Sequence, residues 1–258
     1  MDSKIIIGKV MEKREFSQLP LADVEKAFSH FEKRQVSDAE KVRLTRELLH
    51  KVFGAFGGRK LFSLKEKEPD WFLRKHLSTR ERLPFYGDVY GRIFEGIGKK
   101  FSVIDLGAGI NGLSYGYFEK RGFNVNYVAI EAIGQFVDLM KDYFSREKIP
   151  GEAIHLSLFE IEKVVKVLKN QRRPRVALMF KVVDSLEMLD RDYSQRLLLE
   201  ISKFSERVVL SFATRSMISR KRFRADRGWI FNFIHDNFKV LDDFEIGSER
   251  FVVFRKRE

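Results

Sequence analysis

The stretch VIDLGAGING, at residues 103–112, joins a run of apolar residues to a turn that contains three glycines. The apolar run predicts a buried strand, and the residues after the turn predict a helix. Gly107 and Gly109 allow the backbone to adopt a positive φ and to approach a ligand closely. Asp105 ends the strand, where it could order the turn or reach an amino group of the ligand. Because ligands of parallel α/β sheets bind at the carboxyl ends of the strands, this turn is the first candidate site.

Short β-branched runs alternate with helical stretches on the C-terminal side of this turn, which predicts a mainly parallel sheet with helices on both faces. Phe238–Phe244 and Arg250–Phe254 predict a terminal antiparallel hairpin. Five strand–helix units closed by such a hairpin are the layout of class I S-adenosylmethionine-dependent methyltransferases, a Rossmann-like α/β fold. The expected strands cover residues 101–106, 124–130, 153–156, 175–180 and 207–212, and the expected helices cover 112–121, 134–148, 159–170 and 193–204.

The first hundred residues have apolar positions at helical spacing instead. Ser37 is a plausible N-cap with Glu40 three residues later, a capping box, and Gly57 and Gly58 predict the end of that helix. We therefore expect a helical N-terminal domain over residues 1–98 and a methyltransferase domain over residues 99–258. The expected helices of the N-terminal part cover 21–33, 39–56, 69–77 and 83–97.

Composition restricts the class of protein. The 258 residues include no cysteine, which excludes disulfides, thiol catalysis and cysteine-ligated metals. No apolar run is long enough to span a bilayer, and the N-terminus does not have the pattern of a signal peptide. The net charge of +12 indicates a polyanionic partner, with nucleic acid ahead of a membrane. We expect a cytoplasmic protein that binds neither a membrane nor a metal and acts as a monomer.

The glycine turn is open to three interpretations. Gly107, Gly109 and Gly112 match the dinucleotide fingerprint G-x-G-x-x-G, and a turn without any ligand is a further alternative. An acidic residue two positions before the first glycine, together with the asparagine inside the turn, favours S-adenosylmethionine. Glu131, at the end of the second strand, would accept hydrogen bonds from ribose hydroxyls with either cofactor.

Four segments occur in an order that is typical of one family. They are HLSTRERL at 76–83, the glycine turn, ALMFK at 177–181 and SFATRS at 211–216. In this order the chain resembles the aminoglycoside-resistance 16S ribosomal RNA guanine-N7 methyltransferases from about residue 40 to the C-terminus. That family shows H-x-S-T-x-E-R-L, then D-x-x-C/A-G-x-N-P-L, then a strand ending F-K, then S-F-P-T-R-S. Its N-terminal helices dock on the 30S subunit, and its core modifies guanine 1405.

The resemblance implies roles for individual residues. Arg82 would clamp the methionine carboxylate of S-adenosylmethionine, which a planar guanidinium suits through paired hydrogen bonds. Glu131 would bind the ribose. The cofactor site would also include His76, Ser78, Asp105, Gly107, Ala108, Gly109, Asn111, Ser157, Leu158 and Phe180, and the residues facing the target base and RNA would be Phe180, Lys181, Thr214, Arg215 and Ser216.

The sequence departs from the family pattern at four places. Gly112 and Ala213 stand where the family has proline, and Val183-Asp184 replaces a leucine–proline pair. The family also has an acidic residue at the adenine end of the cofactor, near the position of Ser157. These departures bear on cofactor binding and on the choice of target.

The implied reaction needs no general base, because guanine N7 carries a lone pair and no proton. The five histidines show no metal-ligand spacing, which agrees with this chemistry. Phe180 and Phe212 are candidates for stacking on an extruded base, with core packing as the alternative. The residues expected to bind RNA are Arg43, Arg46 and Lys51 in the N-terminal helix and Arg215, Arg220, Lys221, Arg222 and Arg224 in a basic loop.

Two other functions stay open at this level. The protein could methylate a different RNA, because of the departures at Gly112, Ala213 and Asp184. It could also be a ribosome-binding protein without catalytic activity, built on a methyltransferase scaffold.

Overall fold

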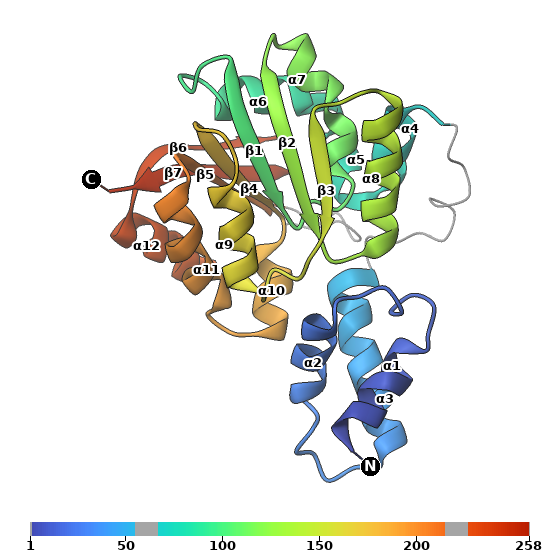
Figure 1. The fold of residues 1–258 in the computed structure, drawn as a ribbon. Helices are drawn as coiled ribbons and strands as arrows, with labels where there is room; N and C mark the ends of the chain where they lie inside the picture. The colour runs from blue at the N-terminus through green and yellow to red at the C-terminus, as the bar shows by residue number, and fades with distance from the viewer. Residues whose placement is uncertain (1, 55–66, 215–226, 258) are drawn as a thin grey trace.

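A computed structural model describes residues 2–54, 67–214 and 227–257 of the chain. Its sheet has the strand order β3-β2-β1-β4-β5-β7-β6 (Figure 1). Strands β1 to β5 are parallel, and β7 is antiparallel to both β5 and β6. This arrangement confirms the class I methyltransferase fold with its C-terminal hairpin. The strands are β1 (Lys100–Leu106), β2 (Asn124–Glu131), β3 (Gly151–His155), β4 (Arg175–Phe180), β5 (Arg207–Ala213), β6 (Phe238–Ile246) and β7 (Glu249–Lys256).

The central strands are buried on both faces, which explains their nearly continuous apolar sequences. In β1 every residue after Lys100 is buried. Val103 packs into the hydrophobic cluster on one face of the sheet, and Ile104 packs into the cluster on the other. The first face is covered by α4 (Pro69–Lys75), α6 (Tyr86–Ile93), α7 (Gly116–Lys120) and α8 (Gly134–Arg146), and the second by α9 (Ile161–Lys169), α10 (Val183–Leu189), α11 (Tyr193–Ile201) and α12 (Gly228–Asn237).

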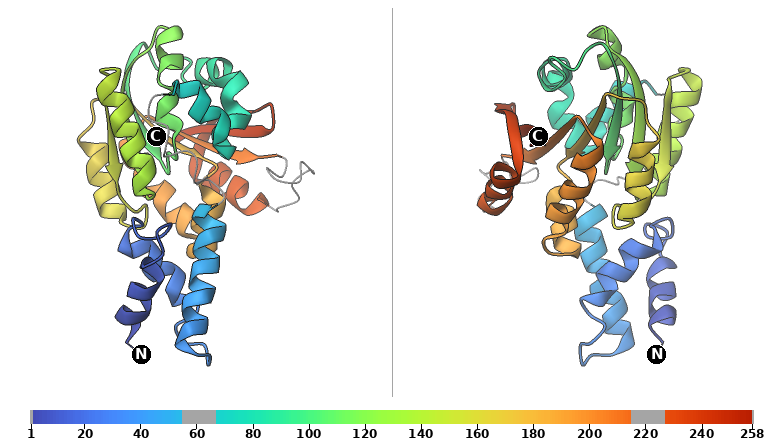
Figure 2. Two further views of the ribbon diagram at one scale, coloured as in Figure 1. Left: turned by 90° about the vertical axis from the view of Figure 1, so that its right-hand side faces the viewer. Right: turned by 60° about the vertical axis from the view of Figure 1, so that its left-hand side comes forward.

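Three N-terminal helices form a separate hydrophobic cluster at one end of the sheet (Figures 1 and 2). They are α1 (Ser3–Met11), α2 (Leu21–Ser29) and α3 (Asp38–Leu49). The capping box at Ser37 is confirmed on one side, since the backbone N–H of Glu40 donates to the Ser37 hydroxyl over 3.2 Å. Helices α1, α10 and α12 lie outside the ranges that the sequence predicts to be helical. The helical pattern of apolar residues in α1 is short, because the buried face of this helix consists only of Ile6, Ile7 and Val10.

Helices α4 and α6 share the hydrophobic core of the sheet rather than that of α1–α3. A domain boundary at residue 98 stays a prediction, and these contacts place α4 and α6 with the sheet that follows them.

Two of the expected helices are interrupted near the site. The one expected over 39–56 is α3, followed by a single π-helical turn, η1 (His50–Gly54). The one expected over 69–77 ends at Lys75, because His76 adopts an extended conformation and a new helix, α5 (Leu77–Arg82), begins after it. A 3₁₀ turn, η2 (Leu83–Phe85), follows, with Pro84 in its first turn. The break at His76 brings this side chain toward the glycine turn.

Within the described ranges, no helix is both long enough and apolar enough to cross a membrane. No cluster of three or more potential metal ligands occurs in the same residues.

Candidate functional site

A cavity of about 790 Å³, including its opening to solvent, lies at the carboxyl ends of the parallel strands. Its size is typical of a site for a cofactor or other small molecule. Eleven of the residues predicted for the site line it: His76, Ser78, Arg82, Gly107, Ala108, Gly109, Asn111, Glu131, Leu158, Phe180 and Lys181. Segments that are far apart in the sequence therefore meet around one space.

The glycine turn forms part of the cavity wall. Gly107 and Gly109 have φ values of +70° and +56°, as their predicted role requires. A Cβ atom on Gly107 would lie 2.5 Å from Cγ2 of Val182, and one on Gly109 would lie 3.2 Å from Cε1 of His76. The turn is therefore restricted to glycine both by its backbone and by its neighbours.

Glu131, the last residue of β2, connects this turn to the neighbouring strand. Its Oε2 accepts a hydrogen bond from the Gly109 N–H over 2.7 Å, and its Oε1 accepts one from Ile133 over 2.8 Å. Burial raises the pKa of Glu131, while the backbone N–H donors act in the opposite direction. Each carboxylate oxygen keeps a second lone pair, which could accept a ligand hydroxyl.

Asp105 lies behind the glycine turn and is not among the residues that line the cavity. Its Oδ2 accepts hydrogen bonds from the Tyr127 hydroxyl and, over 2.8 Å, from Nδ2 of Asn111. The Oδ1 of Asn111 in turn accepts from Tyr86 over 2.7 Å and from Arg82 over 3.0 Å. Of the two roles considered for Asp105, this geometry matches the ordering of the turn.

Arg82 is held in a buried ion pair that no local sequence pattern predicts. Its Nη2 donates to Oε1 of Glu249 over 2.6 Å, and both side chains are almost inaccessible to solvent. The guanidinium carbon lies 4.3 Å from the centroid of the Phe180 ring. Within the described residues Nε of Arg82 is buried and has no hydrogen-bond partner.

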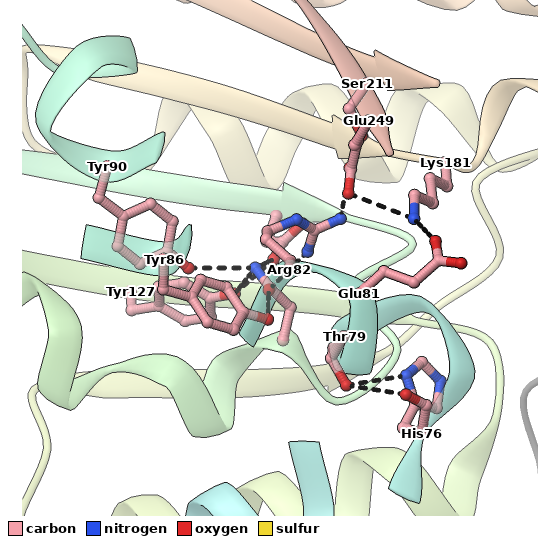
Figure 3. Close-up of polar contacts among 12 residues, drawn as sticks. His76, Thr79, Glu81, Arg82, Tyr86, Tyr90, Tyr127, Lys181, Ser211 and Glu249 are labelled. Carbon is pink, nitrogen blue, oxygen red and sulfur yellow. Dashed lines mark hydrogen bonds and ion pairs between the residues drawn. The ribbon is translucent and has the colours of Figure 1, made fainter. Parts of the chain in front are cut away.

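Lys181 extends the same network of charges (Figure 3). Its Nζ lies 2.6 Å from Oε2 of Glu81 and 3.2 Å from Oε2 of Glu249. The Ser211 hydroxyl donates to Glu249 as well. Lys181 has a φ of +56°, an uncommon conformation for a residue other than glycine. Arg82 and Lys181 are thus partly neutralised by two carboxylates at this end of the cavity.

His76 is neutral in this environment. Burial lowers its pKa to about 3, and the nearby positive charges of Arg82 and Lys181 act in the same direction. Its Nδ1 lies 3.3 Å from the Thr79 hydroxyl, and its ring packs edge-on against Phe136. A histidine with this pKa would not act as a general base near neutral pH.

The opposite end of the cavity is mainly apolar and reaches the N-terminal helices. Ile133 and Phe159 line it and also pack against the hydrophobic cluster of α1–α3. Asp23, from α2, lines the same space and is only 3% exposed. Ser157 is buried but does not line the cavity, and its hydroxyl is hydrogen-bonded to Asp23 and accepts from the Phe159 N–H over 3.1 Å.

Burial raises the pKa of Asp23 to about 7, and the charges of Glu131 and Glu160 add to this effect, whereas the Ser157 hydrogen bond opposes it. An unfolded chain releases this proton near pH 4. Between these two values the folded protein binds more protons than the unfolded chain, so the contribution of Asp23 to stability falls as the pH rises. The loss of stability caused by ionising the buried Asp23 carboxyl group is complete once the pH is above the pKa of the folded protein.

Replacing Asp23 with asparagine should remove this pH-dependent cost. Relative to the wild type, the melting temperature of Asp23→Asn should increase by roughly 3–6 °C more at pH 8 than at pH 5. Thermal unfolding followed by circular dichroism at both pH values measures the difference. Glu25→Gln is the matched control, because Glu25 lies exposed on the same helix. An equal difference at the two pH values would contradict the raised pKa.

The structure does not bring all predicted residues to the cavity. The N–H of Thr214 donates to the backbone of Ser248 over 2.9 Å, and Phe212 packs in the core beneath α12. Core packing, the alternative considered for Phe212, is therefore what the structure shows. The predicted residues Arg215, Ser216, Arg220, Lys221, Arg222 and Arg224 lie outside the described residues.

The basic residues of α3 and η1 differ in their contacts. Arg43 forms ion pairs with Glu40 and Glu47 on its own helix. Arg46 donates to the backbone carbonyls of Lys9 and Val10 and so connects α3 to α1. Lys51 is exposed. Of these three, Lys51 alone makes no contact of this kind with a described residue, and its charge is presented to solvent.

Three charged residues at the site were not predicted from the sequence. Glu81 stands inside the matched segment, so its position next to the arginine was an available signal. Glu249 begins a hairpin strand, and Asp23 lies in an ordinary amphipathic helix. Neither of these has a local sequence signal, because each reaches the site only through the tertiary structure.

Gly112, which departs from the family pattern, has a packing role. A Cβ atom there would lie 2.8 Å from Cζ of Phe144 and 2.9 Å from Sδ of Met140, both on α8. Glycine therefore allows the segment after the turn to pack closely against this helix.

Comparisons with known proteins agree with this fold. The 16S rRNA (guanine(1405)-N(7))-methyltransferase of Frankia casuarinae is 24% identical over 265 residues, which cover 85% of this chain and 81% of that protein. The enzyme of the same name from Proteus mirabilis is 22% identical over 289 residues, which cover 96% and 95% of the two chains. The crystal structure of 16S rRNA methyltransferase RmtF in complex with S-adenosyl-L-homocysteine matches with a TM-score of 0.79 at 19% identity, over 100% of both chains.

A family model decides the classification. The model described as ribosomal RNA methyltransferase (FmrO) matches residues 68–232, which is more than half of the chain. The matched range contains the segment around Arg82, the glycine turn, Glu131 and Lys181. The chain belongs to the FmrO family of ribosomal RNA methyltransferases.

Proposed function

We propose that this protein transfers a methyl group from S-adenosylmethionine to N7 of guanine 1405 in 16S rRNA. The observation that carries the proposal is the single cavity in which the glycine turn, Glu131 and Arg82 meet. Membership of the family supports the reaction class, and the two curated relatives, both named for guanine 1405, support the target.

The chemistry of the cavity fits S-adenosylmethionine along its whole length. Glu131 has lone pairs for the two ribose hydroxyls. Nε of Arg82, a buried donor without a partner, suits the carboxylate of the methionine moiety. The apolar end, with Leu158 and Ile133, suits the faces of a purine ring. We assign the cofactor to the cavity in this orientation.

The reaction requires the protein to position its substrates rather than to move a proton. S-adenosylmethionine supplies an electrophilic methyl group, and guanine N7 offers a lone pair. The protein would therefore contribute by holding the two in line and by excluding water. Lys181 and Phe180 are the residues we assign to the target base, since they line the charged end of the cavity.

We further propose that basic residues among the first hundred and the basic segment over residues 215–227 contact rRNA on the 30S subunit. Residues 1–100 carry 22 Lys and Arg against 15 Asp and Glu, an excess of +7, of which residues 51–100 supply +6. Phosphate contacts by such residues would position the subunit, while the cavity would select the base. Monomeric action is part of this proposal.

The experiment that tests the function is methylation of purified 30S subunits. After incubation with S-adenosylmethionine, borohydride–aniline cleavage and primer extension should give a stop at guanine 1405 that is absent without the cofactor. Tritiated S-adenosylmethionine offered with 30S, 50S, 70S and tRNA tests the choice of substrate. A stop at another nucleotide would exclude the proposed target, and no incorporation into any RNA would exclude the proposed activity.

Binding to 30S subunits should fall steeply as the salt concentration rises, because phosphate contacts release counterions. Lys51→Ala should weaken binding and reduce the slope of log K against log salt by about one. Filter binding over a series of salt concentrations measures both quantities. Lys169→Ala is the control, since Lys169 is also exposed but ends α9, shortly before the N-terminal end of β4. Binding that does not depend on salt would contradict the electrostatic proposal.

A further inference from the structure

Asp23 is part of an N-terminal helix, but its side chain lines the cavity at the carboxyl ends of the strands. It lies on α2, which is fastened to the rest of the protein by two contacts with the end of α10. Nζ of Lys26 lies 2.8 Å from Oδ2 of Asp190, and Nε2 of His30 lies 2.9 Å from the carbonyl oxygen of Leu189. These contacts hold α2 where its Asp23 side chain lines the same space as Glu131.

The carboxyl group of Asp23 is incompletely satisfied. Ser157 bonds to the carboxyl group, whereas Oδ2 is buried and has no hydrogen-bond partner in the part of the chain that the structure describes. Leaving such an atom unpaired is unfavourable, so its retention on a cavity wall indicates a place for a ligand atom that donates a hydrogen bond.

The surroundings of Asp23 restrict what that ligand group can be. The wall next to it is apolar, with Ile133, Leu158 and Phe159, and suits a flat ring. Glu131 lies next to this wall, because its carboxylate accepts hydrogen bonds from Ile133 of the wall and from Gly109 of the glycine turn. A ring attached to a ribose at Glu131 would therefore present its edge to Asp23.

We propose that Asp23 binds the 6-amino group of the cofactor's adenine, so that the N-terminal helices supply part of the cofactor site. The inference rests on the proposed use of S-adenosylmethionine. The amino group is the exocyclic donor of adenine, and Oδ2 of Asp23 is a buried acceptor without a partner. Ser157 lies two residues after the end of β3, and its hydrogen bond to Asp23 makes it a positioning residue for that carboxyl group.

The raised pKa of Asp23 is compatible with this role. Near pH 7 the carboxyl group exists in both forms, and the acidic groups that face it, Glu131 and Glu160, favour the neutral form. The charged form accepts a hydrogen bond from the amino group, and the neutral form could in addition donate one to a ring nitrogen. A ligand donor at Oδ2 would stabilise the charged form and lower the pKa.

Isothermal titration calorimetry with two ligands tests the assignment. One is S-adenosylhomocysteine, and the other is its 6-deamino analogue, in which the base is unsubstituted purine. Wild-type protein should bind the first at least about tenfold more tightly, because the analogue leaves Asp23 unpaired. In Asp23→Ala this ratio should approach one, and in Asp23→Asn, which keeps an acceptor oxygen, it should be intermediate. Glu25→Ala, an exposed carboxylate on the same helix, should keep the wild-type ratio.

Equal affinities of the wild type for the two ligands would overturn the role of Asp23, and so would an unchanged ratio in Asp23→Ala. If Asp23→Ala does not fold, the wild-type ratio and Asp23→Asn still decide the question. Failure of the wild type to bind either ligand at millimolar concentration would overturn the proposed cofactor, and the role of Asp23 with it. The two failures are therefore distinguishable.

Discussion

Replacing Arg82 with alanine is expected to abolish methylation and to weaken the binding of S-adenosylhomocysteine by at least about 100-fold. The variant removes the donor Nε, and it leaves Glu249 buried without its main partner. Breaking a buried ion pair on one side costs about 3–5 kcal/mol, so the free energy of unfolding should fall by a similar amount. Calorimetry measures the affinity, and urea denaturation measures the stability.

Arg92→Ala is the matched control for this variant. Arg92, on α6, pairs with Asp242 over 2.7 and 3.0 Å, and Asp242 lies on the same C-terminal hairpin as Glu249. Unlike the Arg82–Glu249 pair, this pair is substantially exposed. Its loss should cost less than about 1 kcal/mol and leave cofactor affinity unchanged. If Arg82→Ala folds and binds S-adenosylhomocysteine as the wild type does, Arg82 does not contact the cofactor.

Gly107→Ala is expected to have an effect of comparable size on cofactor binding. A φ of +70° is unfavourable for alanine, and the new Cβ would lie 2.5 Å from Cγ2 of Val182. Backbone strain and overpacking together should lower the free energy of unfolding by about 2–4 kcal/mol. The turn would have to move, so the affinity for S-adenosylhomocysteine should fall by at least about 100-fold. Calorimetry and urea denaturation again report the two effects separately.

Gly116→Ala provides the comparison for Gly107→Ala. Gly116 begins α7, and a Cβ atom there would meet no other atom within 4 Å. Alanine at this position should leave affinity unchanged and leave stability equal or slightly higher, since alanine favours helix. Wild-type affinity in Gly107→Ala would show that the turn does not need its glycine to accommodate the cofactor.

The parallel strands, the glycine turn and the terminal hairpin were predictable, because the signals for them are local. A strand buried on both faces is a continuous apolar run, and a positive φ is readily supplied by glycine. β4 has the predicted bounds, and β1, β2 and β5 differ from their predictions by one residue at one end. Errors occur where neighbouring elements decide the conformation, as at His76, where one expected helix ends and α5 begins.

The cavity and its lining could be predicted only in part, for a related reason. Its glycines and Glu131 follow strand ends, and parallel strands bring their carboxyl ends to one edge of a sheet, so their meeting follows from the sequence pattern. The partners that set the charges of the site come from elsewhere in the chain. Glu249 is 167 residues from Arg82, and their ion pair forms only because β7 inserts beside β5.

The sequence by itself thus determined the parallel strands and the glycine turn, since these depend on the periodicity of side chains and on the conformational freedom of glycine, whereas the class of ligand followed from the order of the four family segments. Only the tertiary structure decided which groups are buried together. It placed Glu249 against Arg82 and brought Asp23 from the N-terminal helices to the apolar end of the cavity. Burial and electrostatic interaction depend on distance in space rather than on separation along the chain, and no local pattern encodes them.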